Sequence, residues 1–508
     1  MRLGRLSLTL VLAGLLARPA EGQARQPINA HDLALLNRVS WGQSESAAAA
    51  MESLGARAWL RRQLHPRAAD PLPVAAQSQI DALAISLAPM TVQVQQLDLQ
   101  AKAAAQLKDP DQRKAAQQAY QQSLSNLARD AATRSLLRDL YGPDQLQEQM
   151  TWFWLNHFNV HMGKRDIRAM VGDYEDQALR PRALGKFRDL LESTLKHPAM
   201  LRYLDNDQNA AGHINENYAR ELMELHTMGV GSGYTQADVQ ELARILTGVG
   251  VDLSPDPPRL KPAYQPLLVR QGLFEFNPNR HDFGDKLFLG HVVKGAGYAE
   301  VEQALDILSR QPATARHISA QLAAYFMGDA PPAGVVERMA KTFQRSDGDI
   351  AAVLGVLFES SEFEASLGKA FKDPMHYTVS AVRLTYDDKV IVNTAPMQSW
   401  LNRMGEGLYN HETPDGYALG SAAWDGPGQL ALRFEIARQL GSGAAGLFKP
   451  DPPAAKEIPA FPQLQNALYF EAGLDRGLGA ATRAALSQAS SPQEWNTLFL
   501  ASPEFMRR

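Results

Sequence analysis

The sequence predicts a mainly α-helical protein: one multi-helix globular body with helical hairpins, long proline-rich loops and little or no β-sheet. Two observations lead to this expectation. Apolar residues recur at helical spacing through most of the chain, and two segments concentrate prolines that no helix can continue through. Because 45% of its 508 residues are hydrophobic and only 21% are charged, the chain can bury a substantial core.

The N-terminus has the pattern of a secretory signal peptide. Arg2 and Arg5 precede an apolar run over residues 6–16, and the small residues Gly22 and Ala24 frame a cleavage point. The run is too short for a permanent span, which needs about 20 residues, and no later stretch is long and apolar enough. We therefore expect residues 1–24 to be removed and the mature protein to be periplasmic or secreted, without a transmembrane span.

The overall composition argues against two classes of function. The 51 basic and 55 acidic residues give a net charge of -4, which offers no field to attract a nucleic acid. The chain has no cysteine, so no disulfide staples it and no thiolate serves as nucleophile or metal ligand.

The pattern predicts one large helical domain over residues 25–508, with a possible subdivision into 25–141, 142–330 and 331–508. Residues 77–140 are rich in Ala, Gln and Leu and predict two long helices joined at Asp109-Pro110. A further helix is expected to begin at Pro143. Helical spacing also relates Leu146, Met150, Phe153 and His157; Phe187, Leu190, Leu191 and Leu195; Val301, Ala304, Leu305 and Leu308; and Ile318, Leu322, Tyr325 and Phe326.

Two proline-rich segments, 253–266 and 450–462, are expected to be loops or insertions. The stretch 267–295 that follows the first is also predicted to be loop-like. It crowds aromatic residues with His281, Asp282 and Lys286, and loops of this kind are often functional.

Residues 213–250 predict a tight helical hairpin. Asn215 can cap a first helix that runs through Met228 and ends at Gly229, and Thr235 with Asp238 resembles the capping box of a second helix that ends near Gly248. On the first helix, one face carries Asn217, Arg220, Glu221 and Glu224. With Glu216 and His226, the segment has six ionisable or amide groups within eleven residues.

These residues resemble the bacterial family called domain of unknown function 1800. The resemblance is carried by residues 215–230, 233–239 and 246–248, and by 152–158, 281–290 and 502–505, which together span nearly the whole mature chain. It implies an exported, largely helical protein, often encoded beside a second uncharacterised exported family that is similar to alkaline-phosphatase-type or sulfatase-type hydrolases. The resemblance implies no particular reaction. The sequence departs from the family's usual pattern at His161 and His317.

We expect the family-like segments to fold around one pocket of an enzyme. The candidate catalytic residues are His157 as general acid/base or ligand, Glu221 and Glu224 as carboxylates beside it, Arg220 as their orienting cation, and His281 with Asp282 on a closing loop. The candidate substrate-binding residues are Asn156, Asn217 and Lys286.

The chemistry of this pocket is open between two kinds of hydrolysis. A divalent metal could be held by His157, Glu221, Glu224 and His281, although His157 and His161 lack the glutamate of a zinc-protease helix, and Glu224 lacks a histidine three residues later. Acid-base catalysis by an imidazole and paired carboxylates does not require such a fixed sequence spacing. The paired carboxylates could act on a glycosidic bond. No nucleophile elbow, Walker loop or dinucleotide-binding glycine motif is present.

The alternative is a non-catalytic accessory or scaffold protein for secretion or cell-surface assembly. In that reading the same polar residues form a buried network that fixes helix packing, Arg220 and Glu224 form a solvated ion pair, and His157 is a satisfied core histidine. Trp152, Trp154 and Phe158 then supply area for the core or for a partner.

Overall fold

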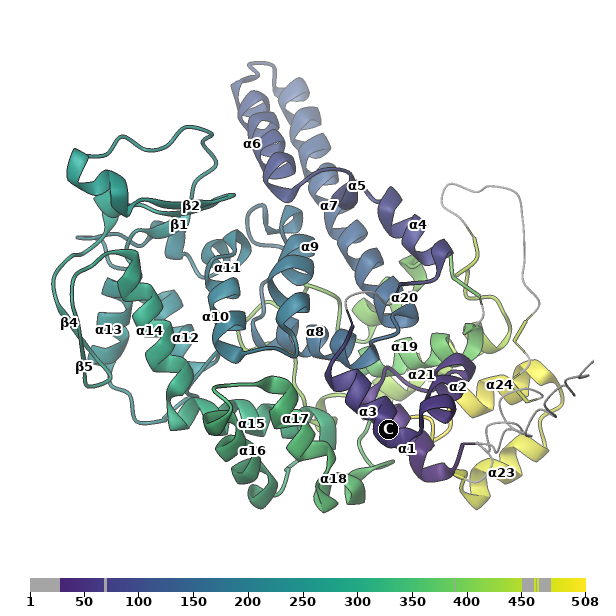
Figure 1. The fold of residues 1–508 in the computed structure, drawn as a ribbon. Helices are drawn as coiled ribbons and strands as arrows, with labels where there is room; N and C mark the ends of the chain where they lie inside the picture. The colour runs from purple at the N-terminus through teal and green to yellow at the C-terminus, as the bar shows by residue number, and fades with distance from the viewer. Residues whose placement is uncertain (1–27, 68–70, 388, 450–460, 463, 466–476) are drawn as a thin grey trace, which may run out of the picture.

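The computed structural model describes residues 28–67, 71–387, 389–449, 461–462, 464–465 and 477–508. The described chain is predominantly helical with a few short strands, as predicted (Figure 1). The expected signal peptide and most of the second proline-rich segment lie outside the described residues. Within the described ranges, no helix combines the length and apolar content needed to cross a membrane.

The N-terminal part contains the predicted helical hairpin, which projects from the body (Figure 1). Asp109 caps the second helix and Pro110 is its first residue, because a proline there sacrifices no helical hydrogen bond. The first helix begins only after Pro89, so residues 77–88 form separate short helices instead of one long one. The helices here are α1 (Ala30–Val39), α2 (Glu45–Leu54), α3 (Ala56–Leu64), α4 (Val74–Ala82), α5 (Ala84–Leu87), α6 (Met90–Gln106) and α7 (Pro110–Tyr141).

The helix predicted at Pro143 starts two residues later, as α8 (Gln145–His157). Its stripe of Leu146, Met150 and Phe153 is fully buried. The segment after it is irregular and includes a π-helical turn, η2. The elements are η1 (Ile167–Ala169), α9 (Val171–Asp173), η2 (Tyr174–Leu179), η3 (Arg180–Arg182), α10 (Phe187–Leu195), α11 (Pro198–Tyr203) and η4 (Asn206–Gln208).

The predicted hairpin over 213–250 forms as α12 (Asn217–Glu224) and α13 (Gln236–Ile245), with the Thr235–Asp238 capping box in place. The first helix ends one turn earlier than predicted. His226 N–H bonds the Glu221 carbonyl oxygen and Met228 N–H bonds that of Met223, so the backbone turns five residues apart instead of four. Glu216, not Asn215, occupies the N-cap position, while the Asn215 side chain accepts a hydrogen bond from Asn217 N–H at 3.0 Å.

The stretch 267–295 is not all loop, which corrects the prediction. It holds four short strands, and in one of them Phe274 and Phe276 flank Glu275 and bury their rings. β1 (Val249–Val251), β3 (Phe274–Phe276) and β2 (Val269–Gln271) form an antiparallel sheet in the order β1-β3-β2, and β4 (Lys286–Phe288) pairs with β5 (His291–Val293). The proline-rich segment before it is a loop with a 3₁₀ turn, η5 (Pro262–Leu267), and η6 (Pro278–Arg280) follows β3.

The C-terminal half is a series of helices whose predicted stripes are buried. The C-terminal segment lies beside α1, the first described helix (Figure 1), because Leu33 of α1 and Phe499 of α24 line the same cavity. The helices are α14 (Tyr298–Arg310), α15 (Pro312–Met327), α16 (Ala333–Arg345), α17 (Ile350–Phe358), α18 (Ser361–Ser366), α19 (Pro374–Tyr386), α20 (Ala395–Arg403), η7 (Ser421–Ala423), α21 (Pro427–Gly441), α23 (Ala480–Ser487) and α24 (Pro492–Leu500).

Candidate functional site

The structure divides the predicted site residues into three groups. His157 lies among aromatic rings at the end of α8, Arg220, Glu221 and Glu224 lie on α12, and His281 lies after β3. Among the described residues, no side-chain hydrogen bond, ion pair or ring contact joins His157 to the α12 carboxylates or to His281. Each group therefore has its own environment and its own chemistry.

His157 belongs to a cluster of three imidazoles. Its ring centre lies 6.1 Å from that of His226 and 6.2 Å from that of His317, and the Phe158 ring lies 4.7 Å away. His157 Nε2 bonds the His226 carbonyl oxygen at 3.1 Å, and His317 Nε2 bonds that of Leu225 at 3.1 Å. The turn that ends α12 is thus held by two imidazoles. Burial, with the neighbouring imidazoles, holds the pKa of His157 well below its usual range.

His226 is the innermost member of this cluster. It is fully buried, and neither ring nitrogen has a hydrogen-bond partner among the described residues. Burial and the proximity of His317 lower the pKa of His226 to about 3. All three imidazoles are therefore neutral at pH 7, since burial also lowers the pKa of His317.

Arg220 lies on the solvent side of α12 and orients two carboxylates. Its guanidinium contacts Glu224 at 3.3 Å, and Glu216 and Gln236 at 3.1 Å and 2.9 Å. The side chains of Arg220 and its two acids are 25% to 36% exposed, so this is the partly solvated ion-pair face that the spacing predicts. Asn217, at the start of the helix, donates through Nδ2 to the Leu204 carbonyl oxygen at 3.1 Å.

His281 sits in a sealed network below the surface. Its Nε2 contacts Glu300 Oε1 at 2.9 Å, its Nδ1 contacts the Thr247 carbonyl oxygen at 2.8 Å, and the Lys286 ammonium contacts the other oxygen of Glu300. The side chains of His281, Lys286 and Glu300 have no exposed area. Although burial opposes ionisation, the hydrogen bonds from His281 and Lys286 lower the pKa of Glu300.

Asp282 is held in the same region by Arg244, whose Nε lies 2.8 Å from its carboxylate. Its other oxygen accepts from Gly284 N–H at 2.8 Å. This closed set of interactions favours a structural role for the 281–286 segment, because every charged group already has its partner.

A loop that the sequence-based reasoning did not select lies against the end of α8. Residues 407–417 are clamped there by asparagines: Asn156 donates to the Tyr417 carbonyl oxygen at 2.9 Å and accepts from Tyr417 N–H at 2.6 Å. Asn159 donates to the carbonyl oxygens of His411 and Thr413 at 3.0 Å and 2.8 Å. Asn156, which is predicted to bind substrate, holds this loop through both hydrogen bonds.

Two further tyrosines fix the same loop. The Tyr203 hydroxyl, at the end of α11, donates to the Glu412 carbonyl oxygen at 2.8 Å, and the Tyr409 hydroxyl donates to the carboxylate of Glu175 in η2. Tyr409 itself has a φ of 58°, a left-handed conformation that a bulky residue rarely adopts. The loop is therefore held in one defined shape by α8, η2 and α11.

The clamped loop brings Asp415 within electrostatic reach of Glu221 on α12. Partial burial raises the pKa of the Glu221 carboxyl, and the charges of Glu224 and Asp415 raise it further, while Arg220 opposes them. For Asp415, burial opposes ionisation, but hydrogen bonds from Thr413 at 2.5 Å and from His411 at 3.3 Å lower its pKa. The environment thus separates the proton affinities of two neighbouring carboxyl groups. The Asp415 side chain is 64% exposed, so it is accessible to a solute.

The signal for this loop was present in the sequence but is not a periodic one. Residues 411–415 read His-Glu-Thr-Pro-Asp, which concentrates three ionisable groups beside a proline. Because this segment lies far from α12 in the sequence, its pattern does not predict that Asp415 comes within electrostatic reach of Glu221.

The predicted metal ligands His157, Glu221, Glu224 and His281 fall into the three separate groups described above. Across the described residues, no three or more His, Cys, Asp or Glu side chains are arranged to hold a metal ion.

Fold and site together define a mainly helical protein in which a carboxylate-bearing loop, held by α8, η2 and α11, lies within electrostatic reach of α12. The chain belongs to the family described as "Protein of unknown function (DUF1800)", which it matches over residues 34–507. This confirms the family resemblance over nearly the whole chain. No curated protein and no solved structure matches the chain.

Proposed function

We propose that this protein is an exported hydrolase in which Glu221 and Asp415 are the acid-base pair, acting on an extracytoplasmic substrate. The observation that carries the proposal is the clamped loop 407–417, which places an exposed carboxylate near the partly buried carboxyl group of α12.

The roles follow from the two environments. Titratable neighbours whose proton affinities are driven apart can work as acid and base at the same pH. Glu221, whose pKa is raised by burial and by Glu224 and Asp415, is suited to protonate a leaving group. Asp415, kept ionised by Thr413 and His411, is suited to activate water or to attack the substrate directly.

The substrate class that fits best is one with an acid-labile bond between sugar units. Paired carboxylates hydrolyse such bonds by protonating the glycosidic oxygen on one side and supplying a base or nucleophile on the other. His411 supports this use, because its Nε2 contacts both Asp415 Oδ1 and Thr413 Oγ1 and so restricts the orientation of the Asp415 carboxylate.

Export is part of the same proposal and is supported by the N-terminal sequence. Arg2 and Arg5 before the apolar run, and Gly22 and Ala24 after it, are typical of a cleaved signal peptide. We expect protein recovered from the periplasm or medium to begin directly after Ala24, as intact-mass measurement would show. A precursor retained in the cytoplasm at full length would contradict the export proposal.

The catalytic proposal is tested with a panel of chromogenic glycosides and with polysaccharides, using E221Q and D415N. General acid-base groups contribute about 100- to 10,000-fold to rate, so each variant should lose that much kcat with an unchanged melting temperature. D415N should also remove the acidic limb of the pH profile, and E221Q the basic limb.

Glu412→Gln is the matched control, because Glu412 lies on the same loop with an exposed side chain and only its main chain contacts Tyr203. It should retain activity. Absence of turnover across the panel, or turnover that survives both E221Q and D415N, would reject the pair.

The alternative function is that of a non-catalytic accessory protein, with a co-encoded hydrolase-like exported protein as the partner to test. The sealed network of His281, Lys286 and Glu300 supports it, because His281 and Lys286 of a family-like segment both bind Glu300 and none of the three side chains has any exposed area. Under this alternative, the co-encoded protein should be secreted in the same amount with E221Q or D415N as with the unsubstituted protein.

A further inference from the structure

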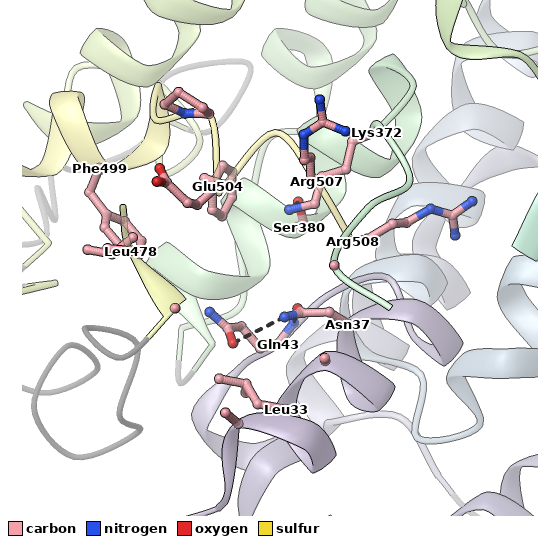
Figure 2. A pocket seen from close by; sticks show the side chains of 16 residues that line it. Leu33, Asn37, Gln43, Lys372, Ser380, Leu478, Phe499, Glu504, Arg507 and Arg508 are labelled. Atoms are coloured by element: carbon pink, nitrogen blue, oxygen red, sulfur yellow. Dashed lines mark hydrogen bonds between the residues drawn. The ribbon is translucent and has the colours of Figure 1, made fainter. Parts of the chain in front are cut away.

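A cavity of about 410 Å³ lies between α1, the start of α19 and the C-terminal segment. Figure 2 shows Lys372 and Ser380 on one side, Asn37, Gln43 and Leu33 on the opposite side, and Phe499 and Leu478 at one end. None of these residues takes part in the proposed hydrolytic site. The cavity is therefore a separate site.

Lys372 is the buried lysine of this cavity, and it has no counter-ion among the described residues. The residue is 3% exposed, and its ammonium makes one hydrogen bond, to Ser380 Oγ at 3.0 Å. It also lies 3.8 Å from the centre of the Phe505 ring. No carboxylate of the described residues lies within ion-pair distance of it. Two of its three N–H donors are thus free of any acceptor among the described residues.

The surroundings of Lys372 add positive charge. Burial and the charges of Arg433 and Arg508 hold the pKa of Lys372 well below its usual range. The Arg508 guanidinium turns away from the cavity and bonds the Tyr325 carbonyl oxygen at 2.6 Å (Figure 2). The acid that lines the cavity, Glu504, already accepts hydrogen bonds from Gly479 N–H and Thr482 Oγ1, both at 2.7 Å.

The opposite side offers amide groups. Gln43 N–H donates to Asn37 Oδ1 at 2.8 Å, and Asn37 Nδ2 donates to Gln43 Oε1 at 3.4 Å, which fixes the Gln43 side chain (Figure 2). Its Nε2 has no acceptor among the described residues. The remaining lining is largely apolar and includes Leu33, Phe499 and Phe505.

We propose that this cavity binds a monocarboxylate with an apolar tail. The carboxylate would accept hydrogen bonds from Lys372 Nζ and Gln43 Nε2, and the tail would lie against Leu33, Phe499 and Phe505. A buried ammonium without a counter-ion is unfavourable, so an anionic ligand that neutralises it gains a charge-assisted hydrogen bond in a site of low polarity. The apolar wall excludes strongly hydrated anions and adds affinity in proportion to the area that the tail buries.

The test is calorimetric titration of the full-length protein with octanoate, and with octanol as the neutral probe of similar shape. Octanoate should bind with one site per chain. Octanol should bind about ten- to a hundredfold more weakly, because it lacks the charge that pairs with Lys372. Lys372→Met should remove this preference, and Lys341→Met, an exposed lysine on α16, should leave it unchanged.

A second variant guards against misfolding of the first. Leu33→Trp fills the cavity from α1 while leaving the ammonium in place, and it should abolish octanoate binding. Equal affinity for octanoate and octanol, octanoate binding that persists in Lys372→Met, or no binding at millimolar concentration would each overturn the proposal. Binding that persists in Leu33→Trp would place the ligand elsewhere and overturn it as well.

Discussion

Two buried histidines of this protein illustrate opposite uses of an imidazole. His281 has a partner for each ring nitrogen and links Thr247 to the Glu300 carboxylate. His226 is equally buried, yet neither of its ring nitrogens has a partner in the part of the chain that the structure describes. A buried polar atom without a hydrogen bond loses its hydration without compensation, whereas a paired one does not. The same residue type therefore stabilises the fold at one position and destabilises it at the other.

We predict that His226→Leu leaves the free energy of unfolding at pH 7 unchanged or raises it by about 1 kcal/mol, because leucine fills a similar volume without unpaired nitrogens. His281→Leu should lower it by about 2 kcal/mol, because it removes a hydrogen bond to a buried carboxylate. Urea denaturation of the two variants measures both values. A loss of stability in His226→Leu as large as that in His281→Leu would mean that His226 has a partner.

The pH dependence of His226→Leu follows from the same burial. The unfolded chain binds a proton at this histidine below pH 6.5, but the folded chain does so only near its lowered pKa of about 3. A fall in pH therefore destabilises the folded state of the unsubstituted protein. The stability advantage of His226→Leu should grow by about 1.4 kcal/mol per pH unit as the pH falls from 6.5 toward 3. A constant difference over this range would contradict the buried, neutral state of His226.

At the scale of elements, local signals in the sequence predicted local structure. The capping box at Thr235 and Asp238, the cap at Asp109 and the apolar stripe of α8 are all present. Each depends on residues within a few positions of one another, so a single sequence carries the whole signal. The early end of α12 was missed because His157 and His317, far away in the chain, bind the carbonyl oxygens of the turn that follows it.

The candidate site was only half predictable for the same reason. Glu221 could be selected from its polar helix face, but Asp415 lies on a loop whose position is set by Asn156, Asn159 and Tyr203. These contacts join residues more than 200 positions apart, so no periodic pattern in the sequence predicts them. Helical spacing correctly paired Arg220 with Glu224, because four residues separate them.

The clamp on the loop is testable through Asn159. Asn159→Ala removes two hydrogen bonds to the carbonyl oxygens of His411 and Thr413, and it should reduce stability by about 1 to 2 kcal/mol. Hydrogen exchange of residues 409–417 should accelerate more than that of α8 itself. The exposed Asn126→Ala on α7 serves as the control and should change neither quantity. Uniform acceleration over the whole chain would show that Asn159 supports the core, not the loop.

At the scale of the whole molecule, the side chain of Arg38 joins α1 to the end of α15, to Ser366 and to the C-terminal segment. Arg38 on α1 is fully buried and donates to the Phe326 carbonyl oxygen at the end of α15, to Ser366 Oγ at 3.0 Å and to the Ser366 carbonyl oxygen at 2.7 Å. It also donates to the carbonyl oxygen of Arg508. One guanidinium thus joins the three segments 25–141, 142–330 and 331–508 that the sequence offered as a possible subdivision, and so we expect them to unfold together.

Arg38→Met tests this expectation. The substitution removes the Arg38 donors from the carbonyl oxygens of Phe326 and Arg508, so it should lower the free energy of unfolding by about 3 kcal/mol. If the chain is one cooperative unit, calorimetry will show a single transition that shifts as a whole, with equal calorimetric and van't Hoff enthalpies. Arg345→Met, at an exposed position on α16, should leave the transition in place. If instead only part of the heat absorption moves to lower temperature, the three segments fold separately. The contacts of Arg38 would then link domains that fold independently, and the chain would not be one cooperative unit.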